Sequence, residues 1–181
     1  MSIFKILNFE NPNQLKLLER LNYIREPVAT ETDLMTTVYM SSRYPYEEMI
    51  FIKQCHRSAV NDTFQGKQFI EFVLSLTSEE SLYGNDFVAC IKEIDSYLAH
   101  YSEGHYQLIS CIHINTDNLH AHVIMNNTDF MTGKRLVINK ADFFAICENI
   151  NQILNHFDFS NLEQLKKYIN KKTQTLYLGG F

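Results

Sequence analysis

The pattern of apolar and polar positions predicts strands interleaved with helices along most of this chain. Short runs rich in β-branched and aromatic residues predict strands at residues 2–9, 34–40, 67–77, 105–114 and 119–126. Apolar residues at helical spacing, with turn residues between them, predict helices at 13–24, 45–57, 85–102, 140–156 and 161–171. This order of elements predicts an α+β fold in which helices flank a central, mainly antiparallel sheet.

Two of the predicted strands are separated only by a polar turn, residues 115–118, which is rich in Asn and Asp. If these four residues form the loop of a hairpin, His113 lies opposite His120. Residues directly opposed on one face of a sheet have Cβ atoms roughly 4.5–5.5 Å apart. His122 follows two positions later and projects to the same face as His120. The hairpin therefore brings three imidazoles together.

Three neutral imidazoles that converge are typical of a metal site with open coordination positions, as in catalytic centres. The alternative is a pair of exposed strand histidines and one core histidine. A three-histidine metal without cysteine or carboxylate ligands suits a Lewis acid that polarises a carbonyl or phosphoryl oxygen. The sequence has no serine-centred nucleophile elbow, glycine-rich phosphate loop or His-Glu-x-x-His helix.

The chain offers ten tyrosines as possible nucleophiles for such a metal. A tyrosine is a competent nucleophile when a metal or a base assists its deprotonation from a pKa near ~10. Taken alone, each tyrosine is more simply explained as a packing residue whose hydroxyl reaches water. Spacing alone therefore does not identify the partner of the metal.

Length, composition and charge limit the class of protein to which these candidate residues belong. With 181 residues, 45% of them hydrophobic and 20% charged, we expect a single domain over residues 1–181, either minimal or the N-terminal part of a longer protein. The absence of a long apolar run or a signal-like N-terminus predicts a cytoplasmic protein without a membrane span. A net charge of -5 argues against a broad nucleic-acid surface, so any such contact would come from a local basic patch. Four cysteines are expected to be reduced core residues: Cys55, Cys90, Cys111 and Cys147.

Three segments carry a resemblance to a known family. They are LNYIREP (21–27), GKQFIEFVLSLTSEE (66–80) and IHINTDNLHAHVIMNNTDFMTGKRL (112–136). In this order they resemble the tyrosine segment, the strand ending near a serine, and the histidine motif of conjugative relaxases. These enzymes of the mobilization-protein class belong to the HUH endonucleases and nick plasmid or transposon DNA at an origin of transfer.

The resemblance implies a role for each matched residue. Tyr23 would attack the scissile phosphate of single-stranded DNA and leave a 5′-phosphotyrosine and a free 3′-hydroxyl. His113, His120 and His122 would hold a divalent cation, Mg²⁺ or Mn²⁺, that neutralises charge on the phosphoryl oxygens. Asp117 would orient a ligating imidazole or accept the tyrosine proton, although a simple turn-forming role explains it equally well.

The resemblance also implies a DNA-binding surface around the motifs. Exposed aromatic side chains would stack on bases, and accessory DNA-binding and coupling proteins would be further partners. Basic and polar side chains near the motifs are the candidates for contact with DNA: Arg25, Arg43, Lys67, Ser75, Lys134 and Arg135.

Two positions depart from the pattern of the family. Relatives commonly have a histidine where Glu71 stands and an aspartate where Asn115 stands. Glu71 would then serve as an additional acidic ligand or as a base. Asn115 leaves Asp117 as the only acid of the turn.

Three other interpretations remain open. Rolling-circle replication initiators and HUH transposases carry their tyrosine on a helix after the histidines, often with a lysine nearby, and Tyr168 and Lys171 satisfy that order. A second possibility is a relaxase-like DNA-binding module without turnover. The third is a hydrolase in which the three-histidine metal activates water.

Overall fold

The computed structural model describes residues 2–7, 13–60 and 67–163. The strands in this part of the chain are β1 (Ile3–Leu7), β2 (Met35–Val38), β3 (Phe69–Ser75), β4 (Tyr106–His113) and β5 (His120–Asp129). The α-helices are α1 (Gln14–Ile24), α2 (Pro45–Val60), α3 (Gly84–Ala99) and α4 (Lys140–His156). Single 3-10 turns occur at Thr32–Leu34, Glu80–Leu82 and Tyr101–Glu103.

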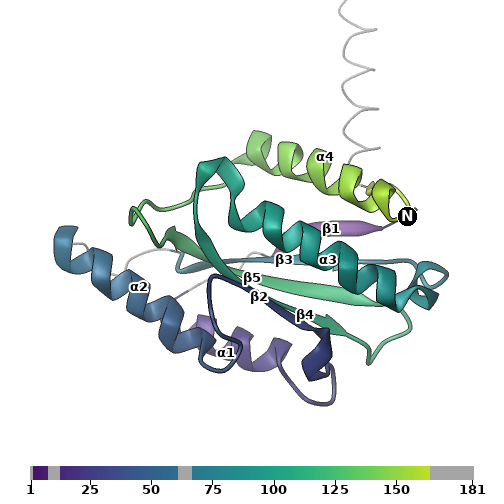
Figure 1. Ribbon diagram of the computed structural model, residues 1–181, viewed down its shortest axis with the longest axis horizontal. Helices are drawn as coiled ribbons and strands as arrows, with labels where there is room; N and C mark the ends of the chain where they lie inside the picture. The colour runs from purple at the N-terminus through teal and green to yellow at the C-terminus, as the bar shows by residue number, and fades with distance from the viewer. Residues whose placement is uncertain (1, 8–12, 61–66, 164–181) are drawn as a thin grey trace, which may run out of the picture.

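The strands form one sheet in the order β1-β3-β5-β4-β2, and every neighbouring pair is antiparallel. Helices α3 and α4 cover one face, and α1 and α2 lie on the other (Figure 1). The α+β prediction is therefore confirmed, with a sheet that is antiparallel throughout the described strands. The helix predicted at 161–171, and with it Tyr168, lies almost entirely outside the described residues.

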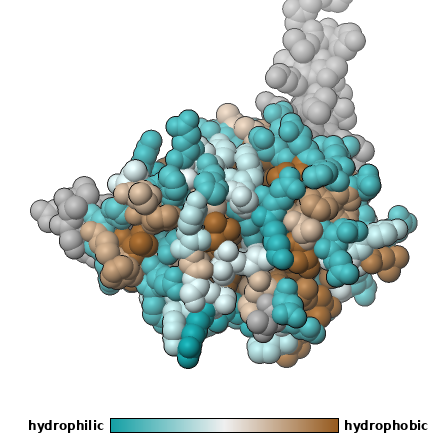
Figure 2. Space-filling view, in the orientation of Figure 1, coloured by the Kyte–Doolittle hydropathy of each residue, from teal (hydrophilic) through white to brown (hydrophobic). Residues whose placement is uncertain are grey.

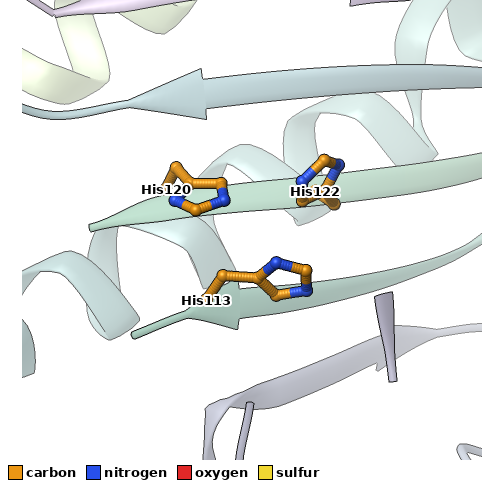
Figure 3. A group of neighbouring side chains, drawn as sticks. All are labelled: His113, His120 and His122. Carbon is orange, nitrogen blue, oxygen red and sulfur yellow. The ribbon is translucent and has the colours of Figure 1, made fainter. Parts of the chain in front are cut away.

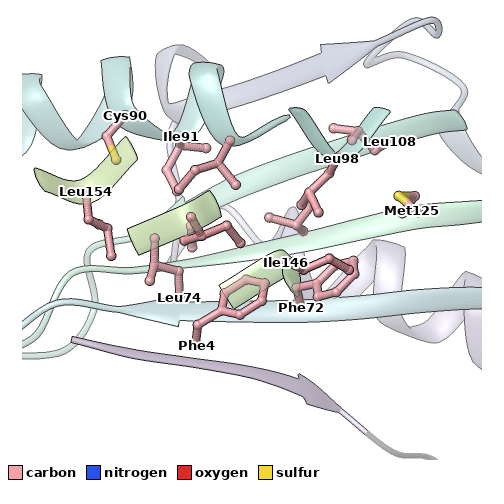
Figure 4. Packing of buried hydrophobic residues seen from close by; sticks show 14 of the residues in the cluster. Phe4, Phe72, Leu74, Cys90, Ile91, Leu98, Leu108, Met125, Ile146 and Leu154 are labelled. Carbon is pink, nitrogen blue, oxygen red and sulfur yellow. The ribbon is translucent and has the colours of Figure 1, made fainter. Parts of the chain in front are cut away.

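The larger core lies between the sheet and helices α3 and α4 (Figure 4). Alternate residues of the three central strands point into it, among them Phe72 of β3 and Val123 of β5. Phe4 of β1 stacks on Phe72 with ring centroids 5.4 Å apart. Because a shift of one residue would turn this apolar set to the other face, the core fixes the register of the strands. The residues between these positions consequently face α1 and α2.

A smaller core holds α1 and α2 on that second face. Leu17, Leu21 and Ile24 of α1 pack with Met49 of α2 against the sheet, where they meet Ile124. The Asn13 side chain begins α1 by accepting a hydrogen bond from the backbone N–H of Lys16 at 3.0 Å. The packing of Leu21 and Ile24 then fixes the C-terminal end of α1 above β4 and β5.

The cysteine prediction is confirmed at three positions and wrong at the fourth. Cys90, Cys111 and Cys147 are buried free thiols, and burial raises the pKa of each to about 12. Cys55 is exposed, because Met49, Ile50 and Lys53 form the buried side of α2 and Cys55 lies on its other side.

The outer surface is mostly hydrophilic in the view of Figure 2, where apolar areas are interspersed with polar ones. Among the described helices, none has the length and apolar character needed to cross a membrane.

A buried carboxyl of α3 makes folding sensitive to pH. Asp95 is 1% exposed and accepts hydrogen bonds from the hydroxyls of Thr36 and Ser110. Burial raises the pKa of Asp95 from 3.8 to about 7 and outweighs the two hydroxyls. Between these values the folded state binds more protons than the unfolded state, so the stability from this group is present below the lower value and falls as pH rises to 7.

We expect Asp95→Asn to remove this part of the pH dependence. The wild type should lose up to about 1.4 kcal/mol per pH unit between pH 4.5 and 6.5 relative to the variant. Urea unfolding at a series of pH values measures the difference. Asp86→Asn, an exposed substitution in the first turn of the same helix, serves as the control. Identical slopes for Asp95→Asn and the wild type would contradict the assignment.

Candidate metal centre and nucleophile

Three histidines converge on one face of the sheet (Figure 3), the face on which α1 packs against Ile109, Cys111 and Ile124. His113 of β4 pairs in register with His120 of β5, and His122 follows on the same strand, which confirms the predicted hairpin. Ring centroids are 5.1 Å apart for His113 and His120, and 4.7 Å apart for His113 and His122. One potential ligand atom from each histidine lies within 4.8 Å of the other two.

Each imidazole also has a hydrogen-bond acceptor on its other side. Nε2 of His113 lies 3.0 Å from the carbonyl oxygen of Ile24, and Nδ1 of His120 lies 3.1 Å from that of Asn118. Nδ1 of His122 lies 2.8 Å from Oε1 of Glu71. Carbonyl and carboxylate oxygens only accept, so these nitrogens carry the proton in the neutral ring and the second nitrogen keeps its lone pair. This arrangement fits a divalent cation.

The charge state of the rings supports the same conclusion. Burial lowers the pKa of His113 and of His120, and the neighbouring histidines lower both further. A lowered pKa favours neutral imidazole, which is the form that binds a metal. His113 and His120 are therefore in the protonation state that binds a cation.

Tyr23 lies beside the histidines, although His113 follows it only about ninety residues later in the chain. Its ring centroid is 5.5 Å from that of His113 and 5.4 Å from that of His122. Tyr23 is 43% exposed, so the residue is accessible from solvent. Packing of Leu21 and Ile24 against the sheet places this last turn of α1 next to β4 and β5.

Glu71 of β3 lies under the site and is 1% exposed. Oε1 accepts hydrogen bonds from Arg20 and His122, and Oε2 accepts a second bond from Arg20 at 2.8 Å. Burial alone would raise the pKa of Glu71, but the bonds from Arg20 and His122 together lower it. The carboxylate is therefore ionised and orients His122. The sequence pattern did not single out Arg20. Its position three residues before Tyr23 on a predicted helix does, however, make the two side chains neighbours on one face of that helix.

Among the other predicted residues, Ser75 pairs with His120 in the register of β3 and β5 and so lies next to the site. Asp117 is exposed in the turn and makes no hydrogen bond or ion pair within the described residues. Instead, the Asn118 carbonyl and the Thr116 hydroxyl contact the ring of His120. A role for Asp117 stays a prediction.

The predicted basic residues fall into separate places. Arg25 directly follows α1, and its buried Nε makes no hydrogen bond within the described residues. Arg43 precedes α2, with its guanidinium carbon 5.2 Å from the ring centroid of Tyr44. Arg135 donates to the Lys67 carbonyl at 2.8 Å, and both lie with Lys134 near the opposite end of β3 and β5 from the histidines. A strand of seven residues spans roughly 20 Å, so the structure does not gather these cations around the histidines.

The fold and the site together define a class of α+β proteins that carry a three-histidine candidate metal centre and an adjacent tyrosine on an antiparallel sheet. A family model described as "Relaxase: MobA/VirD2-like, nuclease domain" matches residues 23–159. This range covers most of the chain, and the protein belongs to the MobA/VirD2-like relaxase nuclease family. A comparison with curated proteins found no match. The match begins at Tyr23 and includes all three histidines.

Proposed function

We propose that this protein is a DNA relaxase that nicks single-stranded DNA at an origin of transfer through Tyr23. The observation that carries the proposal is the position of the Tyr23 ring within 5.5 Å of two rings of the histidine cluster. The nuclease family supports DNA as the substrate. The reaction would serve mobilization of a plasmid or an integrative element in the cytoplasm, with accessory DNA-binding and coupling proteins as further partners.

In the proposed step the phenolic oxygen of Tyr23 forms a bond to phosphorus while the bond from phosphorus to the 3′ oxygen breaks. The phenol loses a proton and the departing 3′ oxygen gains one. The products are a 5′-phosphotyrosyl protein and a DNA end with a 3′-hydroxyl. One phosphodiester replaces another, so the same chemistry in reverse rejoins the strand.

The three histidines would hold the cation, and Glu71 would keep His122 in the orientation that binds it. A bound divalent cation would supply positive charge to the phosphoryl oxygens as negative charge builds on them. Nitrogen ligands favour Mn²⁺ over Mg²⁺ among the two candidate ions. Arg25 and Ser75 are the predicted DNA contacts that lie nearest to the site, and the cations at the other end of β3 and β5 would meet a more distant part of the strand.

The test is adduct formation by the full chain on labelled single-stranded oligonucleotides that tile the DNA flanking its coding region. With Mn²⁺ we expect an SDS-resistant adduct that carries a 3′ label, and a free 5′-labelled fragment that a polymerase extends. EDTA should abolish both products, and peptide mass spectrometry should locate the nucleotide on Tyr23.

Each competing function predicts another result. A hydrolase would release soluble fragments without an adduct. An adduct on Tyr168 would indicate the arrangement of rolling-circle initiators. DNA binding with neither adduct nor fragments, on every oligonucleotide, would indicate a module without turnover.

A further inference from the structure

One arginine contacts both the proposed nucleophile and the carboxylate under the metal centre. Arg20 lies one helical turn before Tyr23 on α1 and outside the range that matches the relaxase family. Its guanidinium carbon is 4.1 Å from the centroid of the Tyr23 ring, within cation–π distance. The arginine side chain is 17% exposed, which limits its freedom to move.

The same guanidinium is bound edge-on to Glu71. Its Nε and one terminal nitrogen donate to the two carboxylate oxygens at 2.8 and 2.7 Å. Such a bidentate pair fixes the plane of the guanidinium as well as its position. The edge of the guanidinium binds the Glu71 carboxylate, and the face of the guanidinium is therefore left for contact with the Tyr23 ring.

The contacts continue from Glu71 to the metal centre. Oε1, which receives a bond from Arg20, also receives one from Nδ1 of His122 at 2.8 Å. Because the Glu71 side chain is fully buried, it cannot exchange Arg20 for water without cost. The orientation of His122 therefore depends on how Arg20 holds the carboxylate.

We infer that Arg20 is a positioning residue that couples Tyr23 to His122, so that nucleophile and metal ligand are held as one unit. This inference rests on the proposed function. A guanidinium can contact a ring with its face and a carboxylate with its edge at the same time, whereas an ammonium group has no flat face. Besides this ion pair, Leu17, Leu21 and Ile24 pack α1 on the sheet, so the helix has apolar contacts that a substitution of Arg20 leaves in place.

The experiment compares Arg20→Lys and Arg20→Gln with the wild type. For Arg20→Lys we expect adduct formation in a single turnover to slow by 10- to 100-fold, while the Kd for single-stranded DNA changes less than about threefold. For Arg20→Gln we expect a similar loss of rate and, in addition, Mn²⁺ binding weakened about tenfold, because Glu71 loses its cationic partner. Calorimetry with Mn²⁺ in the absence of DNA measures the change in Mn²⁺ affinity.

Two further variants separate positioning from other roles. Lys16→Gln, on the same helix and paired with Glu19 at the surface, should leave both rate and Mn²⁺ affinity unchanged. If Arg20 acts through Glu71, the double variant Arg20→Gln/Glu71→Gln should lose no more Mn²⁺ affinity than the more impaired single variant. Circular dichroism and urea unfolding show which variants remain folded.

The inference is overturned if Arg20→Lys forms adduct at the wild-type rate. It is also overturned if the DNA affinity falls in proportion to the rate, since Arg20 would then be a DNA contact. If the wild type itself forms no adduct, the proposed function fails. Unchanged Mn²⁺ affinity in Arg20→Gln would then overturn the coupling separately.

Discussion

Replacement of Tyr23 by phenylalanine should reduce adduct formation by at least about 10³-fold, because phenylalanine has no hydroxyl oxygen to form the bond to phosphorus. The substitution deletes one oxygen atom. It leaves the ring contacts with His113, His122 and Arg20 available, so folding and Mn²⁺ binding should stay close to wild type. Adduct measured on denaturing gels in a single turnover, together with the Kd for the same oligonucleotide, separates loss of chemistry from loss of binding.

Two other tyrosines provide the comparison for that result. Tyr44→Phe alters an exposed tyrosine before α2 and should leave adduct formation unchanged. Tyr168→Phe tests the alternative nucleophile and should also be neutral. Full activity of Tyr23→Phe with loss in Tyr168→Phe would instead assign the reaction to Tyr168 and contradict the proposal.

The parts of the site that the sequence predicts are those fixed by local geometry. A four-residue turn and the two-residue period of strands are sufficient to place His113 opposite His120 and to turn His122 to the same side. Neither depends on any distant part of the chain. The position of Tyr23 required the resemblance to relaxases, because packing of α1 on the sheet brings it there.

The network beneath the histidines could not be predicted in this way. Glu71 was recognisable in the sequence only as a departure from the family, with a role as ligand or base. In the structure, both its oxygens bind Arg20, and one of them also binds His122. That partner set depends on the position of α1 on the sheet, which brings Arg20 to Glu71 and which hydrophobic spacing does not specify. A carboxyl buried in a strand either binds a cationic partner or becomes neutral, so an acid among the apolar residues of a predicted strand is a reason to look for an arginine or lysine nearby.

Alanine at His120 or His122 should weaken Mn²⁺ binding by at least about 100-fold, because even loss of a partner behind a metal ligand costs 10- to 100-fold. His113 is a less clean test. Its Nε2 also donates to the Ile24 carbonyl at 3.0 Å, so His113→Ala should additionally loosen the end of α1 that carries Tyr23. Calorimetry with Mn²⁺ and the full chain, without DNA, measures metal binding independently of catalysis.

His156→Ala is the matched control, because His156 is an exposed histidine near the end of α4 on the opposite face of the sheet. It should bind Mn²⁺ as the wild type does. Unchanged affinity in both His120→Ala and His122→Ala would mean that the imidazoles converge without holding a cation. In that case an adduct on Tyr23 would have to form without metal, and its resistance to EDTA would show it. Loss of Mn²⁺ binding together with loss of the adduct would instead tie the three histidines to the reaction of Tyr23.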